Sequence, residues 1–193
     1  ESFETEDNFE KFRKFSPSGT VPCLVDGDAV VWDSLAIVEY LAEKEAGIWP
    51  DNAGARAFAR CASAEMHSSF SSLRKICPMN CAITVALSSL NADLARDVSR
   101  IDELWQEGLA RFGGGVLAGE RFNAVDAFYC PVAFRVQSYQ LAISPESFAY
   151  CQKLLSLPAM KVWDAAAIKE SWREEAHEEE AEAAGRVIAD RRK

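Results

Sequence analysis

Residues 16–37 decide the fold, and they read SPSGTVPCLVDGDAVVWDSLAI. Val21-Pro22 opens a short apolar run over residues 23–25, where a proline is tolerated because the first strand position need not donate to the ladder. Asp26-Gly27 is a strong signal for a tight turn between two strands. Residues 29–32 are apolar again and form the returning strand. The stretch therefore predicts a β-hairpin.

A helix is predicted directly after this hairpin. Asp33-Ser34 supplies the side chains that cap a helix N-terminus, and the apolar positions Leu35, Val38 and Leu41 follow at helical spacing. The first turn of a helix has free N–H groups, and the helix dipole favours an anion there. Such a helix start suits a carboxylate ligand. Ser34 would also serve as a plain N-cap without any ligand.

The order of these features resembles the glutathione-binding half of the glutathione transferases. In that family a Val-Pro with a cis peptide leads into a strand, a hairpin follows, and an acidic-Ser pair caps the next helix. Val21-Pro22, Asp26-Gly27 and Asp33-Ser34 match these elements in order and at close spacing. An ordinary hairpin-helix unit is the alternative for these residues alone.

The resemblance implies a glutathione site made of Val21, Pro22, Asp33 and Ser34. The main chain of Val21 would pair with the cysteinyl part of glutathione. Ser34 and its amide would take the γ-glutamyl carboxylate, and Asp33 would hold the same end of the ligand. Thr20 stands where many relatives carry a basic residue, so one contact to the glycyl carboxylate is absent from this expectation.

After Trp49-Pro50 the pattern becomes almost entirely helical. Apolar residues recur every three or four positions from Arg56 to Ile76, which predicts one continuous helix that Pro78 ends. A second long helix is predicted over residues 91–112, where a run of three glycines stops it. No strand is predicted in this half.

Asn123-x-x-Asp126 predicts a further helix. This spacing is a variant of the capping box, in which two side chains satisfy free backbone donors reciprocally. The glutathione transferases begin a buried helix of their all-α domain with a Ser/Thr-x-x-Asp box, which this motif resembles. Pro131 should kink that helix. Prolines also predict helix starts for residues 145–155 and 159–172.

The fold class we predict is α+β: a partial thioredoxin-like α/β domain followed by an all-α helical bundle, as in the glutathione transferase fold. The expected limits are 1–50 for the glutathione-binding domain and 55–175 for the all-α domain, with residues 51–54 as the linker. Residues 176–193 carry acidic and then basic side chains and are expected to form a solvated helix or a frayed tail, with Glu182 and Arg186 paired one turn apart.

Only residues 1–15 precede the hairpin loop, and residues 5–15 read as a short helix. A thioredoxin-type half needs a preceding β-α-β unit of roughly 30 residues. We therefore expect the N-terminal portion of that domain to be missing from this sequence. The family's catalytic Ser, Tyr or Cys would lie there, so the catalytic residue is unknown and no serine of this chain is assigned that role.

Composition limits the partners. The chain has 21 Lys and Arg against 30 Asp and Glu, a net charge of −9, which disfavours nonspecific nucleic-acid binding. No apolar run has the roughly 18 residues of a membrane helix, and no signal-peptide pattern is present, so no membrane partner is expected. The six cysteines lack metal-ligand spacing, so no metal is predicted, and free thiols indicate the cytoplasm.

An acceptor-substrate pocket is predicted at His67, Phe70 and Arg74. These residues share one face of the predicted helix at spacings of three and four, and in the family that helix faces the glutathione domain. A buried or partner-facing stripe is the alternative for the same pattern.

The resemblance implies a cytoplasmic glutathione transferase. It would bind glutathione as co-substrate and direct the thiolate at a small electrophile or a disulfide. The family is usually dimeric, which implies a homodimer through the long helices of the second domain. Two alternatives are a noncatalytic transferase-like domain for protein association and a glutathione-dependent isomerase.

Overall fold

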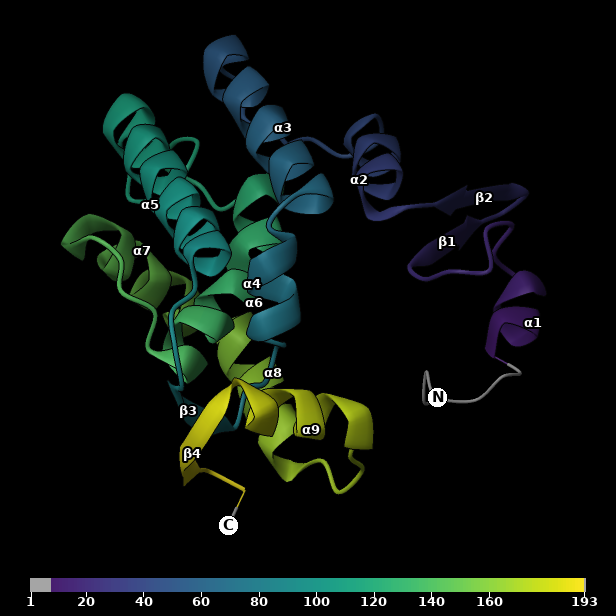
Figure 1. The fold of residues 1–193 in the computed structure, drawn as a ribbon. Coiled ribbons are helices and arrows are strands. Elements are labelled where there is room, and N and C mark those ends of the chain that lie inside the picture. The colour runs from purple at the N-terminus through teal and green to yellow at the C-terminus, as the bar shows by residue number, and fades with distance from the viewer. Residues whose placement is uncertain (1–7, 193) are drawn as a thin grey trace.

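The computed structural model describes residues 8–192, which form a small α/β part followed by a larger helical part (Figure 1). The first part contains α1 (Asn8–Arg13), β1 (Cys23–Asp26), β2 (Ala29–Trp32) and α2 (Ser34–Ala42). The second part contains α3 (Ala53–Ser68), α4 (Ser71–Ile76), β3 (Ile83–Leu87), α5 (Ala92–Phe112), α6 (Ala124–Tyr139), α7 (Pro145–Ser156), α8 (Pro158–Lys169), α9 (Glu175–Ala184) and β4 (Gly185–Asp190). The predicted α+β class is confirmed.

The predicted hairpin is present. β1 and β2 pair antiparallel, with Cys23 opposite Trp32 and Asp26 opposite Ala29. Gly27 in the turn has φ 60°, a left-handed conformation that glycine adopts without steric cost. The predicted helix over residues 5–15 is represented by the shorter α1, and its residues 5–7 lie outside the described part of the chain.

The core lies in the helical part and is centred on α6. Trp105 of α5 is fully buried and meets two tyrosine rings edge-on: Tyr129 at 5.7 Å and Tyr150 at 5.0 Å between ring centroids. These aromatic contacts join α5, α6 and α7 around one centre. T-shaped pairs of this kind add stability beyond the area that they bury.

The predicted capping box at the start of α6 is confirmed. The Asn123 side chain accepts from the Val125 N–H, and the Asp126 carboxylate accepts from the Asn123 N–H at 3.0 Å. The structure adds two partners to Asp126: the Leu117 N–H at 3.1 Å and the Tyr150 hydroxyl at 2.8 Å. Burial raises the pKa of Asp126. This carboxylate therefore ties a loop and two helices together inside the core.

The single helix predicted from Arg56 to Ile76 is wrong. α3 ends at Ser68, and Phe70 has a left-handed backbone with φ 59° before α4 begins at Ser71. Phe70 as a whole is only 4% exposed, so its burial offsets the cost of that conformation. Apolar spacing continues on both sides of the break, which is why the pattern does not reveal it.

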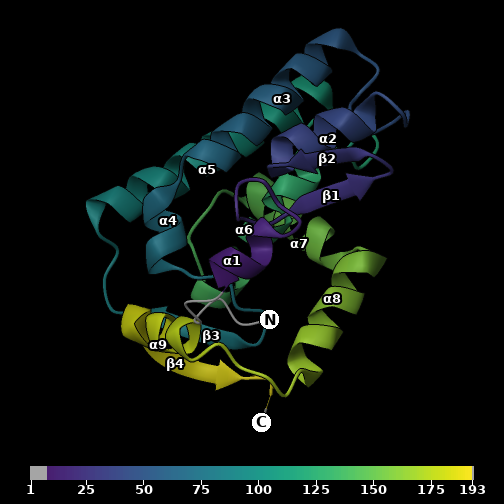
Figure 2. The same cartoon turned by 90° about the vertical axis from the view of Figure 1, so that its right-hand side faces the viewer.

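The all-helical second half is also corrected, because β3 and β4 form a two-stranded antiparallel sheet. The predicted charged tail is helical only in α9, and residues 185–190 are a strand. Glu182 lies in α9 and Arg186 in β4, so they do not share a helix. The helix predicted to reach Trp172 ends at Lys169. The two sheets lie apart: β1–β2 beside α2, and β3–β4 beside α9 (Figure 2).

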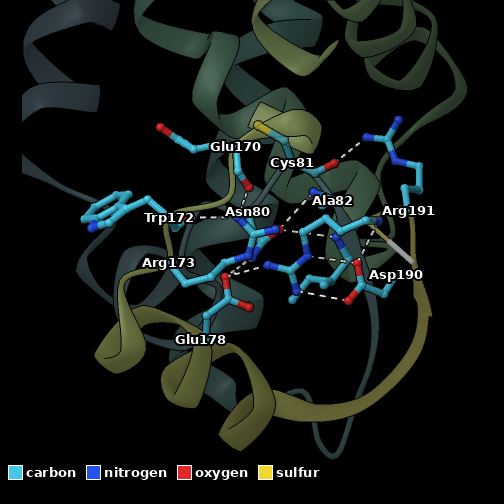
Figure 3. Close-up of polar contacts among 11 residues, drawn as sticks. Asn80, Cys81, Ala82, Glu170, Trp172, Arg173, Glu178, Asp190 and Arg191 are labelled. Carbon is cyan, nitrogen blue, oxygen red and sulfur yellow. Dashed lines mark hydrogen bonds and ion pairs between the residues drawn. The ribbon is translucent and has the colours of Figure 1, made fainter. Parts of the chain in front are cut away.

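Polar contacts hold β4 and the residues after it in place (Figure 3). The Arg191 guanidinium donates to the Cys81 carbonyl and, at 2.9 and 2.6 Å, to both carboxylate oxygens of Asp164 in α8. Arg192 donates to Glu178 of α9 at 2.7 Å and to Asp190 at 2.8 Å. The segment 185–192 is thus attached to α8, α9 and β3 together.

Residues 8–192 show neither a membrane-spanning helix nor a metal-binding cluster. No helix in this range combines the length and apolarity needed to cross a membrane. In the same range no three His, Cys, Asp or Glu side chains gather as a metal-binding group.

Candidate functional site

The predicted glutathione-binding residues lie at two neighbouring points, the entry to β1 and the start of α2. The Val21-Pro22 peptide is cis, as the resemblance implies. Val21 is 43% exposed, and its main chain makes no hydrogen bond to another residue of the described range. The main-chain groups before β1 are therefore open to a peptide-like ligand.

Asp33 and Ser34 form the N-terminus of α2, as predicted. Asp33 is the N-cap with φ 72°, and its Oδ1 accepts from the Leu35 N–H at 2.9 Å. The main-chain carbonyl of Asp33 accepts from the Ile37 N–H at 2.9 Å. Within residues 8–192 no partner is present for the Ser34 N–H. The helix start therefore presents an N–H and a hydroxyl at its positive end, which suits a carboxylate.

His67, from the last turn of α3, contacts both residues of this pair. Its Nε2 lies 3.2 Å from Asp33 Oδ2, and its Nδ1 lies 3.4 Å from Ser34 Oγ. The His67 and Asp33 side chains are 36% and 47% exposed. The histidine predicted for the acceptor-substrate pocket is therefore part of the same cluster as the predicted glutathione residues.

The other two predicted acceptor residues are placed differently. Phe70 packs into the helical core and so presents no open ring surface. Arg74 of α4 donates to the carbonyls of Met66 and His67 at the end of α3. A cation there satisfies free carbonyls and complements the negative end of the helix. Arg74 thus supports the segment that carries His67.

Two ionic contacts fix α2 beside the hairpin and α3. The Asp26 carboxylate at the hairpin turn accepts from Lys44 and, at 2.9 Å, from the Tyr40 hydroxyl, and the bond from Lys44 lowers the pKa of Asp26. Arg60 of α3 donates to both oxygens of Glu39 at 2.8 and 2.9 Å, and this bond lowers the pKa of Glu39. The start of α2 is therefore held at a defined place against α3.

Four buried cysteines are unsuited to act as nucleophiles. Burial raises the pKa of Cys77, Cys130 and Cys151 to about 12 and that of Cys81 to about 11. Thiols with such values stay protonated near neutral pH, and the thiolate is the reactive form. These cysteines therefore pack as small apolar side chains.

Sequence reasoning missed the contact between His67 and the Asp33-Ser34 pair. No local pattern encodes it, because α3 and the start of α2 are far apart along the chain and are joined by an irregular segment. The sequence contained only a general indication of this contact, because the family resemblance places the helix that carries His67 against the glutathione domain.

The comparisons with known proteins agree with this geometry. Residues 2–44 match the family model described as glutathione S-transferase, N-terminal domain. Over 39 residues the chain is 59% identical to glutathione S-transferase Z1 of Arabidopsis thaliana. That alignment covers 20% of this chain and 18% of the plant protein, so the match spans less than a fifth of the relative's length.

Two longer matches extend over most of the chain. The probable maleylacetoacetate isomerase of Vibrio cholerae is 26% identical over 162 residues, 80% of this chain and 75% of that protein. The theta class glutathione S-transferase from Xanthomonas axonopodis pv. citri, solved with glutathione bound, has a TM-score of 0.56 at 24% identity. The structural match covers 82% of this chain and 77% of the Xanthomonas chain. The chain has the glutathione transferase fold, and its residues 2–44 match the model of that family's N-terminal domain.

Proposed function

We propose that this chain binds glutathione between the entry to β1 and the start of α2. The observation that carries the proposal is the helix start at Ser34, whose N–H and hydroxyl lie beside the Asp33 cap. The γ-glutamyl carboxylate would accept from both groups of Ser34. The open main chain of Val21, with Pro22 next to it, would pair with the cysteinyl part of the ligand. Asp33 would hold the amino group of the γ-glutamyl end.

The reaction we propose is transfer of the glutathione thiolate to a small electrophile or a disulfide. Hydrogen bonding and a helix dipole lower a thiol pKa, and the thiolate is the attacking species. The residues named here bind and orient the tripeptide and leave its sulfur unassigned to any side chain. No residue of this chain is proposed as the catalytic group.

Calorimetric titration with glutathione tests the binding site. Ser34→Ala removes a hydrogen bond to a charged group, so the affinity should fall roughly tenfold to a hundredfold. Ser144→Ala is the matched control, since Ser144 is the N-cap of α7 in the helical part. It should lower the unfolding temperature and leave the affinity unchanged. Equal affinities of wild type and Ser34→Ala would contradict the proposed site.

A glutathione-dependent isomerase is the second candidate. The observation that favours it is the long alignment with the probable maleylacetoacetate isomerase of Vibrio cholerae. The two reactions differ in the fate of glutathione: a transferase consumes it stoichiometrically, whereas an isomerase leaves it unchanged. Thiol titration during turnover of an electrophilic acceptor and of a cis-unsaturated diketo acid separates them. Binding of glutathione with neither reaction would favour a noncatalytic role.

We also propose a homodimer in the cytoplasm. Helices α3 and α5 border a surface groove of about 390 Å³ whose lining includes the small residues Gly54, Ala57 and Cys61. Small side chains let a second copy approach closely, and the lining also includes Arg100 and Arg111, which are paired with Glu65 and Glu107. Sedimentation should give twice the monomer mass, and Ala57→Arg should reduce it to the monomer. The free state of all six cysteines supports a reducing compartment.

A further inference from the structure

We infer that His67 is a positioning residue that takes up a proton when the γ-glutamyl carboxylate binds at Ser34. The inference rests on the proposed glutathione site and adds to it a role for the third residue of the cluster. The two ring nitrogens of His67 face Asp33 and Ser34, with Nε2 3.2 Å from Asp33 Oδ2 and Nδ1 3.4 Å from Ser34 Oγ.

The two partners of the His67 ring determine where its hydrogens lie. The Asp33 carboxylate is an acceptor only, so the Nε2 that faces it must carry a hydrogen. In a neutral ring Nδ1 then has a lone pair, and the Ser34 hydroxyl donates to it. The Ser34 hydrogen is therefore directed at His67 and is not available to a ligand.

A bound carboxylate requires the opposite arrangement. It only accepts, so the Ser34 hydroxyl must turn its hydrogen toward the ligand. Nδ1 then faces an oxygen lone pair and needs a hydrogen of its own. Uptake of one proton from solvent by His67 completes a series of three hydrogen bonds. In it, His67 Nε2–H donates to Asp33, His67 Nδ1–H donates to the Ser34 oxygen, and the Ser34 hydroxyl donates to the ligand carboxylate. The imidazolium then lies between two negative groups, the Asp33 carboxylate and the ligand carboxylate.

The charged groups around His67 are compatible with this step. Asp33 of α2 contacts the ring, and Arg74 of α4 contacts the His67 carbonyl rather than the ring. On the same helix Glu65 is occupied by Arg100 of α5, at 2.7 and 2.9 Å. Among residues 8–192, Asp33 is thus the only charged side chain that forms an ion pair with the imidazole.

The test measures protons taken up on binding. S-methylglutathione is the probe, because its thioether has no thiol proton to release. Titrations at pH 7.5 in buffers of different ionisation enthalpy give the number of protons exchanged. Wild type should take up a substantial fraction of one proton. His67→Gln should take up none and bind about threefold to tenfold more weakly, as expected for a lost hydrogen bond.

The second histidine of the chain is the matched control. His177 lies in α9, and its only ion pair within residues 8–192 is with Glu180, so His177→Gln should keep both the affinity and the proton uptake of wild type. Binding by wild type without proton uptake, or uptake that persists in His67→Gln, would overturn the inference and leave the glutathione site standing. Absence of any binding to wild type would overturn both.

Discussion

The α/β part and the helical part of this molecule differ sharply in how they are held together. In the described range, the first apolar side chain to be buried is Trp49, which follows both the hairpin and α2. Before it, Val25 and Trp32 on the hairpin are 58% and 44% exposed. After it, residues from α3 to α9 share one continuous core. The proposed ligand site thus lies on the part with the least apolar burial.

The two parts should therefore differ in stability, because apolar burial and exposed ion pairs contribute different amounts of free energy. Burial of one large apolar side chain contributes about 1.5 to 3 kcal/mol, whereas an exposed ion pair contributes about 1 kcal/mol or less. The helical part has many of the first kind. The α/β part depends on the second kind, through Asp26, Glu39 and the His67 cluster. A two-stranded hairpin alone is marginal in water, so its order depends on these links.

Amide hydrogen exchange should give the largest contrast between the two parts. Amides of β1, β2 and α2 should exchange about a thousandfold faster than those of α5, because local opening needs little free energy where few apolar groups are buried. Mass spectrometry of peptic peptides measures both regions in one experiment. Similar protection of residues 23–42 and 92–112 would break the comparison.

Substitution of Asp126 should test the core from inside. Asp126→Ala leaves three buried donors without an acceptor, those of Leu117, Asn123 and Tyr150, so the free energy of unfolding should fall by about 3 kcal/mol or more. Denaturant unfolding measures this loss. Asp33→Ala is the comparison at an exposed cap, with an expected loss of about 1 kcal/mol. Equal losses at the two sites would mean that burial is not what separates the two parts.

Substitution of Arg191, which directly follows β4, should have a smaller effect. Arg191→Met removes the paired bonds to Asp164 and the bond to the Cys81 carbonyl, at a partly exposed position, so unfolding should cost about 1 kcal/mol less. Arg186→Met is the control, since Arg186 is exposed on β4 and has no ion pair within the described residues. If both variants match wild type in thermal unfolding, β4 is held by its strand pairing alone.

Local signals predicted much of this fold. The hairpin over residues 23–32, the cap at Asp33, the box at Asn123 and the α5 boundaries each depend on residues close together in sequence. Turn chemistry and capping act over three or four residues, so a single sequence reveals them.

The missed features depend on distant partners. β3 is a short apolar run whose pairing strand lies at the other end of the chain, so neither segment signals the sheet alone. Phe70 leaves the helix because its ring gains burial in a core assembled from other helices. For the candidate site, both halves were predicted separately, but the contact of His67 with Ser34 depends on how α2 packs on α3.

The smallest effect is expected at Asp26, in the part without a core. The hydrogen bond from Lys44 holds the pKa of Asp26 below its ordinary value of 3.8, so ionised Asp26 favours the folded state. That contribution is fully present above pH 3.8 and is lost as the pH falls through the lowered pKa. Asp26→Asn should therefore differ slightly from wild type in hairpin amide exchange at pH 6 and match it at acid pH. Because the pair is solvent-exposed, added salt should shrink the difference further. A large loss at pH 6 that persists in high salt would show that this contact holds the hairpin more firmly than exposed charges do, and that the two parts are closer in rigidity than their burial indicates.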